Sequence, residues 1–476
     1  KILWKTGQIC YNLYWKTGQG DEAGMLYRKR HKDIVSWIRT GDKALLVTGA
    51  RQIGKTFLIE ETLKEENADF VSFNLIEQPE VVELFHAVEH SGIEKFLSRL
   101  SLLTEHKFIK GKTILFFDEI QQCRDIVTKV KFLVREGSFK YVFSGSLLGV
   151  ELAGIKSAPV GFMNTLEMFP MDFEEFARAL GLSESVFSSL KSAFDNRTAV
   201  DEFVHDKLME AFYNYLVIGG MPEAVNEYVT SHDYNRVVSV HNAIIPQYKL
   251  DFTKYELENR KLRLLKTYEL IPSELNEKNK RYTFACLDKN LKMERYADSF
   301  EWLVNAGVAI PVYNVTEPKI PLRASEKSNL FKLFLSDVGL LSTMYGRSTI
   351  IKTLNGERDV NYGAIFENAV AQELHSHGYS GYYFNSKKQG EIDFVIEYRN
   401  KCLPIEVKSG KDYNVHSALS NVLKQKLYGI DEAFVLCGKN LEVKEKITYL
   451  PVYMVMFIDE RSEVIPRYDS VSLKDL

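Results

Sequence analysis

The chain has 476 residues, of which 45% are apolar and 26% charged, and its formal net charge is −3. This length exceeds what one hydrophobic core normally serves, so we expect several domains. The near-neutral charge argues against a protein that coats nucleic acid with its whole surface, although it is compatible with a local basic groove. No apolar run is long enough to span a membrane. The five scattered cysteines form no C-x-x-C pair, which predicts a reduced, cytoplasmic protein without structural zinc.

The first 24 residues differ from the rest of the chain. The run WKTGQ occurs at residues 4–8 and again at residues 15–19. The apolar stretch there is too short for a secretory signal. We expect residues 1–24 to be an appended segment without chemistry of its own, and the first domain to begin at Met25.

Residues 45–56 (LLVTGARQIGKT) are an apolar strand followed by a phosphate-binding loop of the form G-x-x-x-x-G-K-T. Lys55 is expected to reach the β- and γ-phosphates of a nucleotide, and the Thr56 hydroxyl to ligate Mg²⁺. The helix that begins here adds the positive end of its dipole. The backbone N–H groups expected to face the β-phosphate belong to Gly49, Ala50, Arg51, Gln52, Ile53 and Gly54. The pattern predicts ATP and Mg²⁺ as cofactors.

A second apolar run, residues 112–119 (KTILFFDE), ends in two carboxylates, as a buried parallel strand with functional groups at its carboxyl end would. Asp118 is expected to hold Mg²⁺ through water, and Glu119 to polarise the attacking water. Further strands are predicted at residues 69–75, 140–146 and 165–169, with helical stretches between them. Ser144 ends one of these strands, and it either senses the γ-phosphate or belongs to a plain Ser-Gly-Ser turn.

Five segments together carry a family resemblance: GARQIGKT, FFDEIQQ, VFSGSLLG, PVGFMNTLEMFPMDFEEF and GGMPEAV. They resemble a group of prokaryotic AAA-type ATPases in which a restriction-endonuclease-like domain follows the ATPase. The resemblance covers nearly everything from Met25 onward and implies an ATP-binding core with the roles given above. It also implies kinship with signal-transduction ATPases that act as switches, whose lid touches the nucleotide through a G-x-P motif. Gly220-Met221-Pro222 matches that motif, but the same residues also terminate a helix, so both interpretations of Pro222 stay open.

The middle of the chain is predicted to be mostly helical. Residues 261–346 show helices followed by two strands at 308–313 and 330–336, which is the order of a winged helix. Such a domain either binds DNA through its second helix or serves as a lid, and the interleaved charges here show no basic face. The predicted domains are an ATPase core (25–180), a helical lid (181–260), a winged-helix-like domain (261–346) and a C-terminal domain (347–476).

The C-terminal domain carries the D-x(n)-E-x-K pattern of the restriction-endonuclease-like superfamily, in Asp393, Glu406 and Lys408, with Glu367 on the preceding helix. Strand alternation puts Glu406 and Lys408 on one face, and a hairpin about residues 399–401 brings Asp393 opposite them. The three carboxylates are expected to hold Mg²⁺, and Lys408 to stabilise charge on a phosphorane. However, a solvent-exposed strand edge with alternating charged side chains would give the same Glu-Val-Lys run. A nuclease-like fold also does not imply nuclease activity.

The predicted fold class is therefore α/β multidomain, with a P-loop AAA-type parallel core, a helical and winged-helix middle, and a restriction-endonuclease-like C-terminal domain. Two functions stay open. One is a Mg²⁺-dependent ATPase coupled to a nuclease-like or DNA-binding domain, with Lys55, Glu119, Asp393, Glu406 and Lys408 as catalytic residues. The other is a nucleotide-controlled switch with slow hydrolysis and an inactive C-terminal domain. DNA, a second copy of the chain and a protein partner are the candidate partners, and no membrane is expected.

Overall fold

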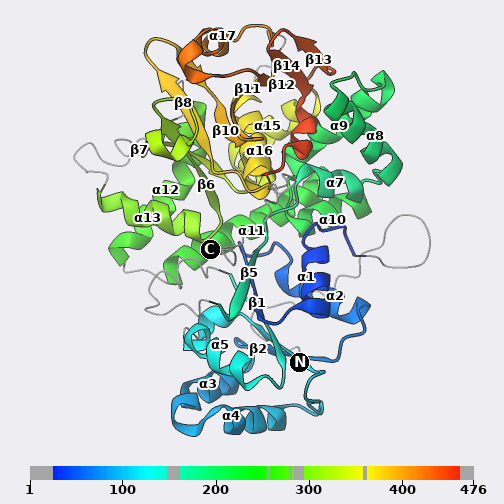
Figure 1. Cartoon of the computed structure of the whole chain (residues 1–476), viewed down its shortest axis with the longest axis vertical. Helices are drawn as coiled ribbons and strands as arrows, with labels where there is room; N and C mark the ends of the chain where they lie inside the picture. The colour runs from blue at the N-terminus through cyan, green and yellow to red at the C-terminus, as the bar shows by residue number, and fades with distance from the viewer. Residues whose placement is uncertain are drawn as a thin grey trace, which may run out of the picture.

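The computed structural model describes residues 25–123, 125–146, 161–254, 258–277, 281–282, 294–357, 362–410 and 412–460. The predicted N-terminal appendage (1–24) and part of the predicted winged helix (283–293) lie outside the described residues. Figure 1 shows one sheet with its helices at one end of an elongated molecule, helices across the middle, and further sheets at the other end. None of the helices in the described ranges combines the length and apolarity needed to cross a membrane.

The first domain is built on a five-stranded parallel sheet with the order β2-β3-β4-β1-β5. Its strands are β1 (Ala44–Thr48), β2 (Phe70–Asn74), β3 (Ile114–Asp118), β4 (Lys140–Ser144) and β5 (Met163–Glu167). Its helices are α1 (His31–Thr40), α2 (Lys55–Glu65), α3 (Pro79–Ser91), α4 (Ile93–Leu100) and α5 (Asp125–Glu136), with short turns η1 (Ser101–Leu103) and η2 (Ile120–Gln122). The predicted parallel α/β core is confirmed. Because parallel strands end at the same edge, residues after β1, β3 and β4 come together there.

Both faces of this sheet are covered. Phe116 of β3 packs into the core that continues into the rest of the protein, whereas its neighbours Leu115 and Phe117 pack into a second core. All three side chains are fully buried. Strand alternation explains this split, because successive side chains point to opposite faces. Burying such a side chain contributes about 1.5–3 kcal/mol, so β3 anchors the site carboxylates that follow it.

The middle of the molecule is helical. Its helices are α7 (Phe173–Ala179), α8 (Glu184–Asn196), α9 (Glu202–Ile218), α10 (Pro222–Ser231), α11 (Tyr234–Lys254), α12 (Glu258–Asn276) and α13 (Glu294–Asn305). Helix α9 ends at Ile218, and the next residue, Gly219, has a φ of +71°, which suits glycine. Pro222 begins α10, where its missing N–H costs nothing. The Gly-Gly-Met-Pro run therefore separates two helices, and its local geometry agrees with the helix-terminator interpretation.

The strand pair expected of a winged helix is present as β6 (Ala309–Val315) and β7 (Glu326–Leu335), which are antiparallel. However, β6 also pairs with β8 (Tyr382–Ser386), and β8 pairs with β9 (Gly390–Ile392). The hairpin is thus half of a four-stranded sheet, β7-β6-β8-β9, that it shares with the C-terminal region. The winged helix stays a prediction.

The remaining sheet has the order β10-β11-β12-β14-β13. Its strands are β10 (Phe394–Tyr398), β11 (Lys401–Val407), β12 (Ala433–Cys437), β13 (Glu442–Lys444) and β14 (Ile447–Pro451). The helices around both sheets are α14 (Val338–Tyr345), α15 (Arg347–Leu354), α16 (Tyr362–Ser376) and α17 (Ser417–Leu423), with short turns η4 (Leu322–Ser325), η5 (Lys426–Tyr428) and η6 (Val452–Phe457). The expected hairpin is present, since β10 and β11 pair around Arg399 and Asn400, both with positive φ.

Candidate functional site

The phosphate-binding loop connects β1 to α2. Gly49 has a φ of +133° and Gly54 a φ of +83°, and a Cβ on Gly49 would overlap the Met168 carbonyl. Both positions therefore need glycine. Helix α2 begins directly at Lys55, so its unpaired N–H groups and its dipole favour an anion in the loop.

Lys55 lies inside this loop. Its ammonium group donates to the carbonyl oxygens of Ala50 at 2.7 Å and Gly49 at 3.1 Å. Burial lowers the pKa of Lys55 to about 8, against the raising effect of Glu119 and Asp118. A phosphate beside the ammonium would offset this desolvation. The loop is thus built around a lysine that an anion would stabilise in its charged form.

Asp118 joins three segments at the carboxyl edge of the sheet. Its Oδ2 accepts a hydrogen bond from the Thr56 hydroxyl at 2.8 Å, and its Oδ1 accepts one from the Ser144 hydroxyl. Ser144 ends β4, which pairs with β1, so it does lie beside the loop strand. A threonine hydroxyl next to an aspartate is a donor set that suits Mg²⁺, which prefers oxygen ligands.

Glu119 follows Asp118 in a left-handed conformation, with φ of +57°. This conformation is uncommon for a residue other than glycine, and such residues cluster at functional sites. The buried Gln121 amide donates to the Glu119 carboxylate and to the Ser146 hydroxyl, the latter at 3.3 Å. Gln121 thus orients Glu119. Sequence reasoning missed it, and its only signal was its place two residues after the acidic pair.

Helices α10 and α11 lie against the phosphate loop. A Cβ built on Gly54 would be 3.7 Å from Cγ of Pro222, so the Gly-Met-Pro run is next to the loop. The Arg51 guanidinium contacts both oxygens of Asp251 in α11, at 2.6 and 2.8 Å, and the Arg51 carbonyl accepts from the Tyr248 hydroxyl at 3.0 Å. The Arg51 side chain therefore points to α11, away from the expected phosphate position.

The N-terminal segment also supports the loop. The buried Arg28 donates to the Ile53 carbonyl at 3.0 Å and to the Phe169 carbonyl at 2.7 Å. It ties the loop to the segment after β5. Sequence reasoning missed this role, because the two acceptors are backbone groups distant in the chain.

The C-terminal carboxylates gather around a lysine that was not predicted. Lys332 of β7 is fully buried. Its ammonium lies 2.8 Å from Glu391, 3.6 Å from Glu367 and 3.9 Å from Asp393. Burial opposes the charge of Lys332, but these carboxylates outweigh it and raise the pKa above the ordinary value. A tethered cation therefore lies beside two of the predicted metal ligands, Glu367 and Asp393.

The other two predicted residues pair with each other. The ammonium of Lys408 lies 2.7 Å from Glu406, and burial raises the pKa of Glu406 although Lys408 opposes this. Asp393 accepts a hydrogen bond from the Val407 N–H at 2.9 Å, as expected from the hairpin. In the described part of the chain, Glu367, Asp393 and Glu406 do not form a group of three ligand atoms within 4.8 Å of one another. Glu391 was missed, although it lies two positions before Asp393 and strand alternation could have found it.

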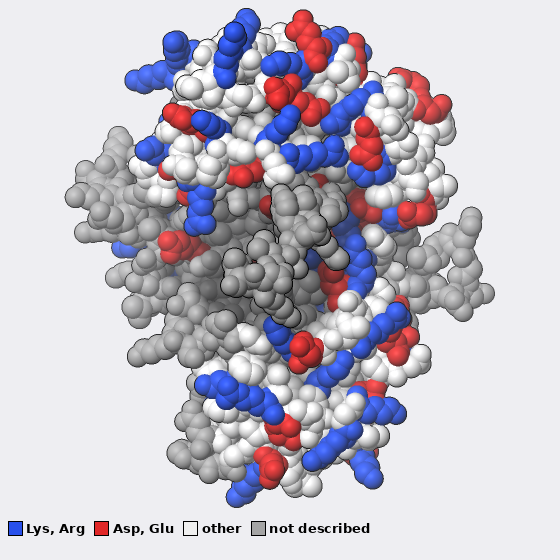
Figure 2. Space-filling model, in the orientation of Figure 1, with Lys and Arg blue, Asp and Glu red and all other residues white. Residues whose placement is uncertain are grey.

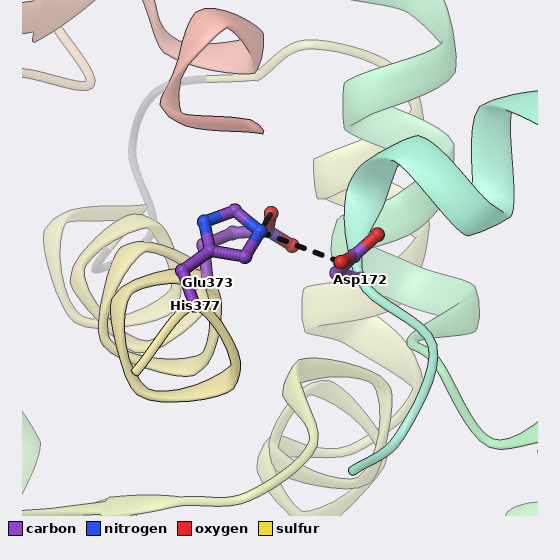
Figure 3. A group of neighbouring side chains, drawn as sticks. All are labelled: Asp172, Glu373 and His377. Carbon is purple, nitrogen blue, oxygen red and sulfur yellow. Dashed lines mark ion pairs between the residues drawn. The ribbon is translucent and has the colours of Figure 1, made fainter. Parts of the chain in front are cut away.

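The described residues contain one group that does meet this ligand spacing: Asp172, Glu373 and His377. Figure 3 shows Glu373 of α16 and His377, directly after the end of that helix, near Asp172, which caps α7. The Nε2 atom of His377 lies 3.4 Å from Asp172 and 3.7 Å from Glu373. The group thus joins the nucleotide-type core to the C-terminal region.

This group already has a cation. The Lys29 ammonium lies 2.6 Å from Asp172 and 2.9 Å from Glu174, and 3.5 Å from Nε2 of His377. The ammonium group therefore contacts both carboxylates and the imidazole ring. The cluster therefore acts as a buried junction between the N-terminal segment, α7 and α16.

Charges on the surface do not identify a nucleic-acid site. On the face shown in Figure 2, lysine and arginine side chains alternate with aspartate and glutamate over the residues drawn in colour. Sequence-independent binding of DNA rests on clustered cations. This face therefore gives no separate support to a DNA partner.

Residues 41–177 match a family model described as an AAA domain. Residues 209–350 and 362–455 match two domains of unknown function, DUF8612 and DUF4143. Residues 41–177 therefore form an AAA-type domain, and the other two models name no activity. No curated protein matches the chain.

Three solved structures illustrate the structural likeness. A Walker-type ATPase of Pyrococcus abyssi is 16% identical, with a TM-score of 0.42, over 70% of this chain and 99% of that one. The RuvB Holliday junction branch migration motor of Thermotoga maritima is 13% identical, with a TM-score of 0.28, over 60% and 89%. Hsp104 in its closed state with ATPγS and casein is 14% identical, with a TM-score of 0.27, over 61% and 52%. Such low values carry no inference about what the present chain acts on.

Proposed function

We propose that this chain is a Mg²⁺-dependent ATPase. The observation that carries the proposal is the meeting of Lys55, Thr56 and Asp118 at the carboxyl edge of a parallel sheet, where Lys55 and Thr56 begin α2. Lys55 would bind the β- and γ-phosphates, and Thr56 and Asp118 would hold Mg²⁺, which supplies charge neutralisation when bound. The chemistry of these residues fits both ions. Among the described residues, the buried Lys55 ammonium donates to backbone carbonyls and not to a carboxylate, so it suits an anion. The Thr56 hydroxyl and the Asp118 carboxylate together suit a cation.

Glu119 is the proposed base. Its carboxylate follows the Mg²⁺ residue directly, and Gln121 holds it by a hydrogen bond. A carboxylate in this position would orient water for in-line attack and take up its proton. Ser144, bonded to Asp118, is the proposed sensor of the γ-phosphate. Pro222 is proposed to contact the nucleotide from the lid.

A second candidate function is a nucleotide-controlled switch with slow hydrolysis, and one observation favours it for the C-terminal region. Asp393, Glu406, Lys408 and Glu367 remain the proposed nuclease-like site, with DNA as its candidate ligand. However, the ammonium of Lys332 supplies the charge that Mg²⁺ would supply there. This arrangement favours a C-terminal domain that binds without cleaving.

Binding of a fluorescent ADP or ATP analogue, measured with Mg²⁺ on the full chain, tests the nucleotide site. Lys55→Ala should weaken binding at least about 100-fold, the scale of losing a charge-assisted contact in a desolvated site. The exposed Lys64 lies on the same helix α2, and Lys64→Ala is the matched control, which should bind like the parent. Equal binding by Lys55→Ala and parent, or no binding by the parent, contradicts the proposal.

Turnover separates the two functions. Phosphate release should require Mg²⁺ and cease in EDTA. A sustained rate that DNA stimulates favours the ATPase coupled to a DNA contact. Nucleotide that stays bound through gel filtration, with little turnover, favours the switch.

A further inference from the structure

Asp337 is a fully buried carboxylate that uses both of its oxygens. It caps helix α14, where its Oδ1 accepts from the Leu340 N–H at 2.9 Å. Its Oδ2 accepts from the Gly220 N–H at 2.6 Å. A helix cap needs only the first of these bonds. The second joins α14 to the turn between α9 and α10.

The turn that Asp337 contacts, Gly219-Gly220, is closely packed against Asp337 on one side and against Met171 on the other. A Cβ on Gly219 would overlap the Asp337 carboxylate, and a Cβ on Gly220 would overlap the Met171 carbonyl. The Gly220 carbonyl accepts from the Met171 N–H at 2.6 Å. On the α14 side, a Cβ on Gly339 would overlap Ile218. The position of Gly220 is therefore set by Asp337 on one side and by the segment before α7 on the other.

This turn leads directly to the phosphate loop. Pro222 begins α10 two residues after Gly220, and its ring is next to Gly54, the last glycine of the loop. Because proline has a fixed φ, the short segment from Gly220 to Pro222 has little conformational freedom. A change in the Asp337–Gly220 contact would therefore move Pro222 relative to the loop.

We infer that Asp337 is a positioning residue of the nucleotide site: by holding the Gly220 N–H it keeps Pro222 against the phosphate loop and so sets nucleotide affinity. This inference rests on the proposed function, because it requires that nucleotide binds in the loop of residues 49–56. Asp337 itself does not reach the loop. It acts through the turn.

The surroundings of Asp337 make this contact sensitive to pH. Burial raises the pKa of Asp337 to about 6, while the N–H groups of Gly220, Leu340 and Gly339 oppose the rise. The titratable groups that face it from the packed helices are Tyr215 of α9, Tyr248 of α11 and Tyr268 of α12, and His241 of α11 contacts Ile218 and Thr343 on either side of it. Protonation of the carboxyl would weaken its acceptance from Gly220.

Asp337→Asn separates the two bonds. Asparagine caps helices about as well as aspartate, so its oxygen can still accept from Leu340. Its amide nitrogen would then face the Gly220 N–H. Both groups are hydrogen-bond donors, so the bond to Gly220 would be lost. The matched control is Asp201→Asn at the N-cap of α9, where Asp201 is exposed and accepts from the Val204 N–H at 3.2 Å. Asp337→Ser, whose shorter hydroxyl can cap but not reach Gly220, replaces Asp337→Asn if that variant does not fold.

The measurement is the Kd for Mg·ADP of the folded full chain at several pH values, checked by a melting curve. At pH 7.5, Asp337→Asn should weaken binding about tenfold or more, as expected for a lost hydrogen bond to a charged acceptor. At pH 5 the ratio of variant to parent Kd should approach one, because the parent carboxyl is then protonated. Asp201→Asn should show a ratio near one throughout.

The outcomes are distinguishable. Binding by the parent with a variant-to-parent ratio of one at pH 7.5 overturns the role of Asp337 and leaves the proposed function intact. A ratio that differs from one but does not change with pH, together with a lower melting temperature, assigns Asp337 a purely structural role and also overturns the inference. A parent that binds no nucleotide refutes the proposed function, and the inference with it.

Discussion

The Thr56 hydroxyl donates a hydrogen bond to the Asp118 carboxylate across 2.8 Å, which joins the phosphate loop to the end of the acidic strand β3. The two residues are 62 positions apart in the chain. The order of the sheet brings them together, because only β4 lies between β1, which leads into the loop, and β3, which ends in Asp118. Thr56 and Asp118 would hold Mg²⁺, and Glu119, the proposed base, follows Asp118 directly in the chain.

Glu119→Gln should keep the affinity for Mg·ATP within about threefold and slow hydrolysis by about two to three orders of magnitude. The amide can still accept a hydrogen bond but cannot take a proton from water. Single-turnover phosphate release on the full chain measures the rate. The exposed Glu83 of α3 provides the control, since Glu83→Gln removes the same charge away from the site. Hydrolysis by Glu119→Gln at the parent rate would assign the base to another group.

Lys332→Met should destabilise the chain by about 3–5 kcal/mol in EDTA, because buried carboxylates would lose their cation. Mn²⁺ or Mg²⁺ should then raise the melting temperature of this variant more than that of the parent, since a divalent ion can replace the lost charge. Melting curves of the full chain with and without metal provide both measurements.

Lys327→Met is the control for this prediction, because Lys327 is an exposed lysine on the same strand β7. It should change stability by no more than about 0.5 kcal/mol. If Lys332→Met were as stable as the parent and indifferent to metal, the carboxylates would not need a cation, and their proposed role as metal ligands would lose its basis.

Lys29→Met should reduce stability by about 3–5 kcal/mol, because it leaves Asp172 buried without its closest cation. Burial disfavours the charged Lys29, but Asp172 and Glu174 raise its pKa above the ordinary 10.5. A raised lysine pKa contributes stability that is fully present below 10.5 and is lost as pH rises through the folded value. The deficit measured by urea unfolding should therefore be the same at pH 7 and pH 9. Lys32→Met, an exposed change in α1, should show no deficit, and a similar result for Lys29→Met would reduce the junction to a surface contact.

His241 should make the protein less stable in mild acid. Burial lowers its pKa to about 4 from the ordinary 6.5, and its ring contacts the Ile218 carbonyl and the Thr343 hydroxyl. Between these two pH values the unfolded chain binds a proton that the folded chain does not, so stability falls as pH falls, by up to about 1.4 kcal/mol per unit. Asp337 contributes the opposite slope, so the test is the difference between the pH profiles of parent and His241→Gln. Parallel profiles of urea unfolding between pH 7 and 5 would contradict this prediction.

The sequence by itself determined the nucleotide-type core. The phosphate loop is one continuous segment in which Gly49 and Gly54 adopt a positive φ. The strands β1 and β3 that carry the site are short, buried apolar runs. The carboxylates Asp118 and Glu119 are recognisable because they directly follow such a run. The hairpin that carries Asp393, Glu406 and Lys408 was predictable for the same reason, since turn and alternation are local properties.

Only the tertiary structure decided which distant side chains complete these segments. Arg51 meets Asp251 across 200 positions, and Asp337 meets Gly220 across 117. Lys332 looks like an ordinary strand residue until tertiary packing places its ammonium next to Glu391, Glu367 and Asp393. The sequence pattern of a segment indicates its secondary structure and its buried face. The partner of a buried charge depends instead on how separate helices and strands pack together. For that reason the sequence located the carboxylates, and only the fold showed that a lysine already lies among them.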